Sequence, residues 1–269
     1  SDVCSSDLEP ILAIHRHEAR SMNMDRQDRL KALGLWPVWR LRGAAMAEPE
    51  AAPPEDPPSA VREPTASPPA PATPPSPVSG LDLDALGAAV ESCGRCPLAR
   101  TRTRGVPGVG DPKAEWLFIG EAPGADEDRL GEPFVGQAGK LLDAMLAGIG
   151  LRRGRNVYIA NILKSRPPGN RDPKPEEVAA CLPYLERQID LIRPKLIVVL
   201  GRIAAQTLLV SDTPIGKLRG HVHQYRGVPM VVTYHPAYLL RNPADKAKAW
   251  EDLVLARQTM AGLKSGAAS

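Results

Sequence analysis

The segment Leu196-Ile197-Val198-Val199-Leu200 is continuously apolar, rich in β-branched residues, and ends at Gly201. A strand that is buried on both faces has this pattern, whereas a strand with one solvated face alternates apolar and polar residues. Three further runs have the same character, and they are residues 116–119 before Gly120, residues 157–160 before Asn161, and residues 230–233 before Tyr234 and His235. The repeated pattern predicts four buried strands.

The segments between these runs have apolar residues spaced three and four apart, which is typical of amphipathic helices. Such spacing occurs in residues 141–149, 178–192, 203–209 and 250–260. The alternation predicts an α/β fold with a central four-stranded, mostly parallel sheet flanked by helices. Ligands bind beyond the carboxyl ends of the strands in such sheets, so we expect functional residues in the loops that follow the strands.

The composition divides the remainder of the chain into segments. Residues 1–21 resemble a translated sequencing-adapter remnant and are interpreted as a non-native leader, which makes Met22 or Met24 the expected start. Residues 22–45 form a short peptide rich in Leu and Trp, expected to be helical, and residues 46–79 form a Pro/Ala-rich linker that is predicted to be disordered. Residues 80–265 are enough for one compact domain with its own core.

Charge and cysteine content narrow the possible function classes. A net charge of +3 permits a nucleic-acid partner without requiring one. No apolar run is long enough to span a bilayer, so we expect a soluble cytoplasmic protein without a membrane partner. The domain has an odd number of cysteines, Cys93, Cys96 and Cys181, which favours a metal or cluster site over a disulfide framework.

Two loops carry unusual sequences. The loop after the first strand combines backbone-permissive glycines, a proline and nearby carboxylates, and its residues are Gly120, Glu121, Ala122, Pro123, Gly124, Glu127 and Asp128. An ordinary turn would also explain these glycines. The loop after the fourth strand begins at His235 and continues through Tyr238, Leu239, Leu240 and Arg241. An exposed apolar pair of this kind is typical of a wedge that inserts into DNA, although the two leucines would equally suit a helix that packs on the core.

Three segments give a specific resemblance: GEAPGADEDRLGEPFVGQAGKLLDAML (120–146), NILKSRPPGNRDPKPEEVAACLPYLERQI (161–189) and VVTYHPAYLLR (231–241). They resemble the motifs of family 4, the iron–sulfur-containing uracil-DNA glycosylases of bacteria. The resemblance implies a three-layer uracil-DNA-glycosylase-like fold around a four-stranded parallel sheet. It also implies a base-excision repair hydrolase that acts on single- or double-stranded DNA as a monomer. The alternative is a non-catalytic DNA-binding module on the same fold.

The resemblance also assigns roles to residues. Phe134 matches the aromatic residue that stacks on the flipped uracil, Asn161 the amide that reads the base edge, and His235 the donor near uracil O2. Backbone N–H groups of residues 120–124 would support the same charge. Glu121 and Glu127 are the candidates for positioning the attacking water, since Ala122 stands where better-known uracil glycosylases carry an aspartate. A salt-bridged or helix-capping role is the alternative for Glu127 and Asp128.

Further expectations concern DNA and a cofactor. Lys164, Arg166, Asn170, Arg171 and Arg241 are candidate phosphate contacts, with solvated surface charge as the alternative. The resemblance implies a [4Fe–4S] cluster that supports the structure. Its ligands would be Cys93, Cys96, Cys181 and a fourth residue at position 165, where this chain has Ser165 in place of cysteine. We therefore expect an incomplete or labile cluster, and free thiols are the alternative.

The peptide ahead of the linker offers a possible partner. Residues 30–42 weakly resemble the N-terminal peptide of the psi subunit of the bacterial clamp loader, which predicts a contact with a replication partner, the linker acting as a tether. The alternative is a helix that packs against the catalytic domain.

Overall fold

The computed structural model describes residues 78–266. The predictions for the leader, for the 22–45 peptide with its clamp-loader contact, and for nearly all of the linker lie outside the described residues. The helical elements are α3 (Leu83–Glu91), η1 (Pro97–Arg100), α4 (Ala125–Leu130), α5 (Gln137–Gly148), η2 (Pro168–Asn170), α6 (Pro175–Ile192), α7 (Arg202–Leu209), α8 (Ile215–Leu218), α9 (Pro236–Arg241), η3 (Pro243–Asp245) and α10 (Lys246–Gly266). The strands are β1 (Val109–Gly110), β2 (Trp116–Gly120), β3 (Val157–Asn161), β4 (Leu196–Leu200), β5 (Val222–Tyr225) and β6 (Val228–Thr233).

The sheet has the strand order β1-β3-β2-β4-β6-β5. The four central strands are parallel to one another, which confirms the predicted parallel sheet. Two antiparallel edge strands, β1 and β5, extend it. Sequence patterns did not reveal these edges, because β1 has only two residues and β5 alternates exposed and half-buried positions. In the parallel register Gly120 lies opposite Asn161, which places the ends of β2 and β3 side by side.

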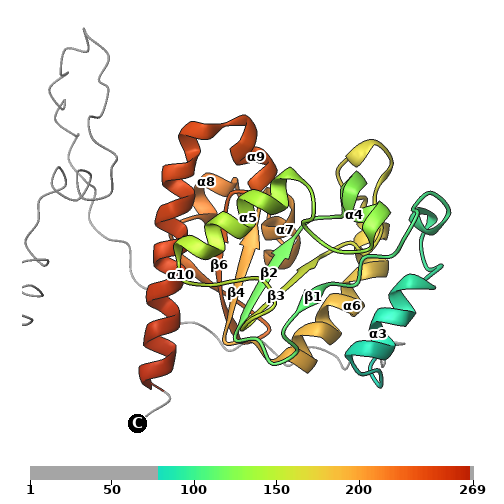
Figure 1. Ribbon diagram of the computed structural model, residues 1–269, viewed down its shortest axis with the longest axis horizontal. Coiled ribbons are helices and arrows are strands. Elements are labelled where there is room, and N and C mark those ends of the chain that lie inside the picture. The colour runs from blue at the N-terminus through green and yellow to red at the C-terminus, as the bar shows by residue number, and fades with distance from the viewer. Residues whose placement is uncertain (1–77, 267–269) are drawn as a thin grey trace, which may run out of the picture. The chain divides into compact units, whose positions relative to one another are not determined.

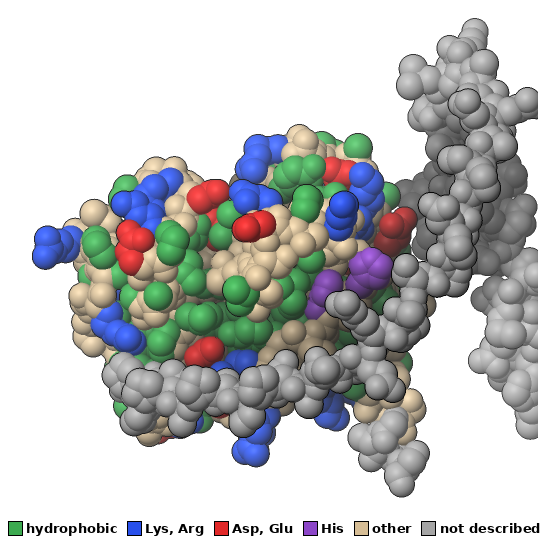
Figure 2. All heavy atoms as spheres, turned by 180° about the vertical axis from the view of Figure 1, so that it is seen from behind, with side chains coloured by type: hydrophobic (Ala, Val, Ile, Leu, Met, Phe, Trp, Pro, Cys, Tyr) green, Lys and Arg blue, Asp and Glu red, His purple; other side chains and the backbone are tan. Residues whose placement is uncertain are grey.

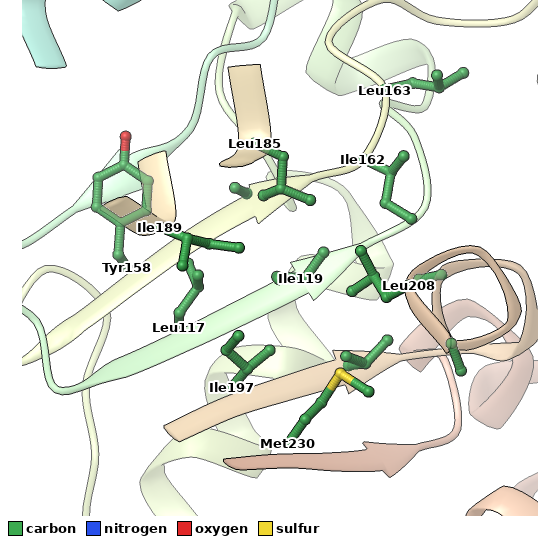
Figure 3. Packing of buried hydrophobic residues seen from close by; sticks show 14 of the residues in the cluster. Leu117, Ile119, Tyr158, Ile162, Leu163, Leu185, Ile189, Ile197, Leu208 and Met230 are labelled. Atoms are coloured by element: carbon green, nitrogen blue, oxygen red, sulfur yellow. The ribbon is translucent and has the colours of Figure 1, made fainter. Parts of the chain in front are cut away.

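Two hydrophobic layers cover the two faces of the sheet, as the alternation of helices and strands predicts. On one face, side chains of α6, α7 and α8 pack against residues such as Leu117, Ile197 and Met230 (Figure 3). On the other face, α5 and α10 pack against residues such as Phe118 and Val198. Figure 1 shows this helix–sheet–helix sandwich. Strands β2, β3 and β4 are buried along their whole length, and β6 is buried from Met230 to Thr233.

The helix that precedes Cys93 and Cys96 lies outside this sandwich. Helix α3 begins after Asp82, whose carboxylate accepts a hydrogen bond from the Ala85 N–H at 2.8 Å and so caps the helix. Its apolar side packs on α6 through Leu86, Val90 and Tyr184. Within residues 78–266, no helix is both long enough and apolar enough to cross a membrane.

Candidate active site

A cavity of about 650 Å³ lies at the carboxyl edge of the sheet, where the loops after β2, β3, β4 and β6 meet. The structure brings together most of the residues singled out in the sequence, and those that line the cavity are Glu121, Ala122, Pro123, Gly124, Glu127, Phe134, Asn161, Asn170, Arg171, His235, Tyr238 and Arg241. Gly120, Arg166, Leu239 and Leu240 are not among the lining residues. The sequence analysis did not identify Asp172, Arg202 and Tyr234 as site residues, although they also line the cavity. Asp172 follows the candidate Arg171, and Arg202 and Tyr234 lie just after the ends of two predicted strands.

The floor of the cavity is packed too tightly for any side chain at position 120. A Cβ atom at Gly120 would lie 2.4 Å from Asn161 Oδ1 and 2.6 Å from Phe134 Cζ. Glycine therefore allows the amide and the ring to approach the backbone of β2. The Phe134 ring is buried, and its centroid lies 5.5 Å from that of His235 at an interplanar angle of 30°. The ring, the amide and the imidazole thus form one continuous surface.

Asn161 ends β3 and is almost completely buried. Neither its Nδ2 nor its Oδ1 atom has a hydrogen-bond partner among the described residues. Its backbone carbonyl accepts a hydrogen bond from Lys164 Nζ at 2.7 Å, and Lys164 also donates to Gln188 Oε1 at 2.7 Å. A donor and an acceptor that lie side by side, buried and unpaired, are rare in proteins and mark a place where a ligand completes the bonding.

His235 is held as a neutral imidazole. Burial, together with the nearby charge of Arg241, lowers its pKa to about 4, while Glu127 opposes this shift. His235 Nδ1 accepts a hydrogen bond from the Ala237 N–H at 3.1 Å, which also caps the start of α9. A neutral imidazole that accepts at Nδ1 carries its proton on Nε2. The side chain is therefore a neutral donor through Nε2.

Glu121 is a carboxyl group that ionises late. Burial and, to a smaller extent, the negative charge of Asp172 raise its pKa to about 7, while Arg202 acts in the opposite direction. Arg202 Nη2 forms an ion pair with Asp172 Oδ2 at 3.2 Å on the cavity wall. A carboxylate whose pKa lies near neutrality is suited to orient a water molecule and to accept its proton.

Glu127 makes contacts of a different kind. Its Oε2 accepts from the Gly124 N–H at 3.1 Å, and its Oε1 accepts from the N–H groups of Val135 at 2.9 Å and Gly136 at 3.1 Å. Asp128 accepts from the Thr103 N–H at 2.9 Å. Glu127 therefore caps the starts of α4 and α5, whereas Asp128 binds loop backbone, and neither arrangement favours water activation. The Gly124 N–H is also engaged, so this donor of the 120–124 loop is not available to a ligand.

Comparisons with known proteins agree with this geometry. The family model of the Uracil DNA glycosylase superfamily matches residues 107–254, which include the whole cavity. The chain belongs to this superfamily. It is 52% identical over 169 residues to a type-4 uracil-DNA glycosylase from Archaeoglobus fulgidus, covering 60% of this chain and 84% of the relative. It is also 43% identical over 183 residues to the type-4 enzyme of Pyrobaculum aerophilum, covering 65% and 93%. A type-4 enzyme from Thermotoga maritima is 42% identical, covering 62% and 87%.

Basic residues around the glycosylase cavity differ in their availability. Lys164 is only 1% exposed, so it cannot contact a phosphate, and this prediction was wrong. Its ammonium group is instead enclosed by partners from β3 and α6. Arg171 forms two hydrogen bonds with the carboxylate of Glu177, and Arg166 donates to Asn170 Oδ1 at 2.8 Å. On the face that Figure 2 shows, basic and acidic side chains are interspersed and do not form a patch of one sign.

The two leucines of α9 have different environments. Leu239 is 1% exposed, whereas Leu240 is 43% exposed. Successive residues of a short helix point in different directions, so one enters the core while its neighbour faces solvent. The structure therefore supports the core-packing alternative for Leu239 and leaves only Leu240 as an exposed apolar tip. Tyr238, on the same helix, stacks on Tyr234, and their ring centroids are 5.0 Å apart.

The three cysteines of the described residues lie near one another. Cys93, Cys96 and Cys181 are unpaired thiols. Burial raises the pKa of Cys181, and the neighbouring Cys96 and Cys93 contribute in the same direction, so the three share a neighbourhood. Within residues 78–266, however, no three Cys, His, Asp or Glu side chains converge closely enough to hold a metal ion.

Position 165 is already engaged with protein. Arg102 Nη1 donates to Ser165 Oγ at 2.7 Å, while its Nη2 donates to the carbonyls of Glu91 at 2.6 Å and Cys93 at 3.0 Å. This guanidinium joins the N-terminal cysteine segment to the loop after β3 without a metal. A hydroxyl engaged in this way is a poor replacement for a thiolate. The residues present therefore do not fit a four-thiolate cluster.

Proposed function

We propose that this chain is a uracil-DNA glycosylase that hydrolyses the N-glycosidic bond of deoxyuridine in DNA, releasing uracil and leaving an abasic site. The observation that carries the proposal is the buried, unpaired amide of Asn161 in a cavity shared with Phe134 and His235. Leaving such a group unpaired costs free energy until a ligand satisfies it.

Base recognition follows from the chemistry of the amide. Uracil presents its N3–H donor beside its O4 acceptor, and Asn161 offers Oδ1 and Nδ2 in the matching order. Cytosine presents an acceptor beside a donor, so one orientation of the amide rejects it through two mismatched bonds. The target base reaches this depth only after it has been flipped out of the helix, and Phe134 then stacks on its face.

Catalysis requires stabilisation of two developing charges. As the bond between C1′ and N1 breaks, its electron pair moves onto the uracil ring, and His235 Nε2–H donates a hydrogen bond to O2, where this negative charge collects. The hydrogen bond from the neutral imidazole is weak while O2 is uncharged and strengthens as negative charge develops there. It therefore stabilises the transition state more than the bound substrate. The sugar becomes cationic at C1′. The Glu121 carboxylate stabilises that cation, orients the water whose oxygen bonds to C1′, and accepts its proton.

The outer residues would hold the DNA. Leu240 occupies the space that the flipped nucleotide vacates, and Arg241 and Tyr238 on the same helix contact the neighbouring backbone. Arg166 and Arg171 would contribute phosphate contacts at the rim. An iron–sulfur cluster, if this chain binds one through Cys93, Cys96 and Cys181, would be a structural cross-link, and no step above depends on it.

The test is an excision assay on end-labelled single- and double-stranded oligonucleotides containing one uracil, without added metal or nucleotide and followed by alkali. We expect cleavage only at the uracil position. Asn161→Asp should shift activity towards cytosine because the carboxylate loses the N–H donor, and His235→Ala should slow excision. His223→Ala, outside the cavity, is the matched control. DNA retention without any alkali-sensitive site would instead support the non-catalytic module, and wild-type rates for both cavity variants would contradict the residue assignments.

A further inference from the structure

The backbone at Phe134 is in an unfavourable conformation. Its φ angle is +56°, in the left-handed region that non-glycine residues rarely adopt. Such a conformation persists only where surrounding contacts hold it, and these residues concentrate at functional sites. The ring of Phe134 forms one wall of the cavity, so whatever holds this backbone also fixes the wall.

Arg153 makes the contacts that hold the carbonyl side of this turn. Its Nη1 donates to the Pro133 carbonyl at 2.9 Å, and its Nη2 donates to the Phe134 carbonyl at 2.8 Å. Its Nε forms an ion pair with Asp143 Oδ1 at 3.0 Å, so all three nitrogens of the guanidinium are engaged. A planar guanidinium with two parallel donors fixes both the distance and the orientation of two carbonyls, which a single-point donor cannot do.

The other sides of the same turn are also fixed. Glu127 binds the N–H groups of Val135 and Gly136 that follow the ring. Below the turn, helix α5 passes so close that a Cβ atom at Gly139 would overlap the Phe134 carbonyl oxygen. Glu127 and α5 restrain the chain after Phe134 and beneath it. Arg153 is the side chain, among the described residues, that binds the carbonyls of Pro133 and Phe134.

We propose that Arg153 is a positioning residue for base recognition, and that its clamp on the Pro133 and Phe134 carbonyls holds the Phe134 ring in the orientation that stacks on the flipped base. The role of the ring rests on the proposed function, whereas the clamp itself does not. Arg153 touches neither the base nor the sugar in this arrangement. It lies in the turn before β3, and its side chain spans from there to the cavity wall.

The first measurement is fluorine NMR, and it does not depend on activity. The chain contains two phenylalanines, Phe118 and Phe134, so labelling with 4-fluorophenylalanine gives two lines. Phe118 is fully buried in the sheet and reports on the fold. In Arg153→Met we expect the Phe134 line to shift or broaden while the Phe118 line stays unchanged. Arg155→Met is the matched control, because Arg155 is an exposed arginine of the same turn. A shift of both lines, or of neither, would overturn the proposal.

The second measurement is uracil excision in two backgrounds. We expect Arg153→Met to lower kcat/KM about 10-fold in the wild-type background and less than about 2-fold when Phe134 is already alanine. Arg153→Lys, which keeps the charge and loses the paired donors, should recover only part of the loss. An equal loss in both backgrounds would show that Arg153 acts other than through the ring. If the wild-type chain excises no uracil, the proposed function fails while the fluorine result still decides the clamp.

Discussion

Replacing Asn161 with leucine should make the protein more stable and inactive at the same time. Leucine has the same number of side-chain heavy atoms as asparagine, and both polar atoms of Asn161 are buried without a partner among the described residues. Each unpaired buried polar group costs about 1–3 kcal/mol. Part of this gain will be lost because the space beside Gly120 and Phe134 is tight. We therefore expect a net stabilisation of about 2 kcal/mol, or a rise in Tm of about 4–8 °C for a domain of this size.

The assay is thermal unfolding followed by the excision assay on the same samples. Excision should fall at least about 100-fold, since two hydrogen bonds to the base are lost. Asn156→Leu is the contrasting variant, because both polar atoms of Asn156 are bonded: its Oδ1 accepts from the Glu115 N–H at 2.7 Å and its Nδ2 donates to Glu115 Oε2 at 2.9 Å, and its φ angle of +56° also disfavours leucine. That variant should melt below the wild type. If Asn161→Leu melts below the wild type as well, the amide is not held unpaired and the reasoning fails.

Four further outcomes follow from individual residues. Because the pKa of Glu121 is raised to about 7 and its carboxylate form is the active one, kcat/KM should rise with pH through about 7, and Glu121→Gln should remove this limb. Leu240→Ala should weaken excision from double strands more than from single strands, while Leu239→Ala, in the core, should lower Tm and affect both substrates alike. Ser165→Cys should raise iron content and Tm together, and equal iron in both proteins would show that position 165 does not limit binding. Val210 is a β-branched residue at the C-cap of α7, where it is 92% exposed and has a φ angle of +49°. Val210→Gly should therefore raise the free energy of unfolding by about 1 kcal/mol. Chemical denaturation measures this, and an unchanged midpoint would contradict it.

The sequence was informative wherever a local pattern determines the environment of a residue. Continuous apolar runs predicted the four parallel strands, and the position of a loop after such a strand predicted that Asn161 and His235 would meet. Local patterns failed where the environment depends on distant partners. Lys164 has the sequence context of a surface charge, yet its partners Asn161 and Gln188 lie on β3 and α6 and enclose it completely. Arg153 lies in an arginine-rich turn that looks solvated, and only the fold shows its contact with the Phe134 carbonyl.

Several features of the cavity oppose stability individually, and they share a cause. Phe134 has a strained backbone, Asn161 has an unpaired amide, and burial disfavours the charged forms of His235 and Glu121. Each of these features costs free energy during folding, before any substrate arrives. The groups therefore need not reorganise when the base enters. The surrounding contacts offset these costs. The turn at Phe134 and the Asn161 amide are held in place by the buried strands on both sides of β2, by the Arg153 clamp and by the Glu127 cap. A substitution that relieves one of these strains should therefore raise stability while it lowers the rate of excision.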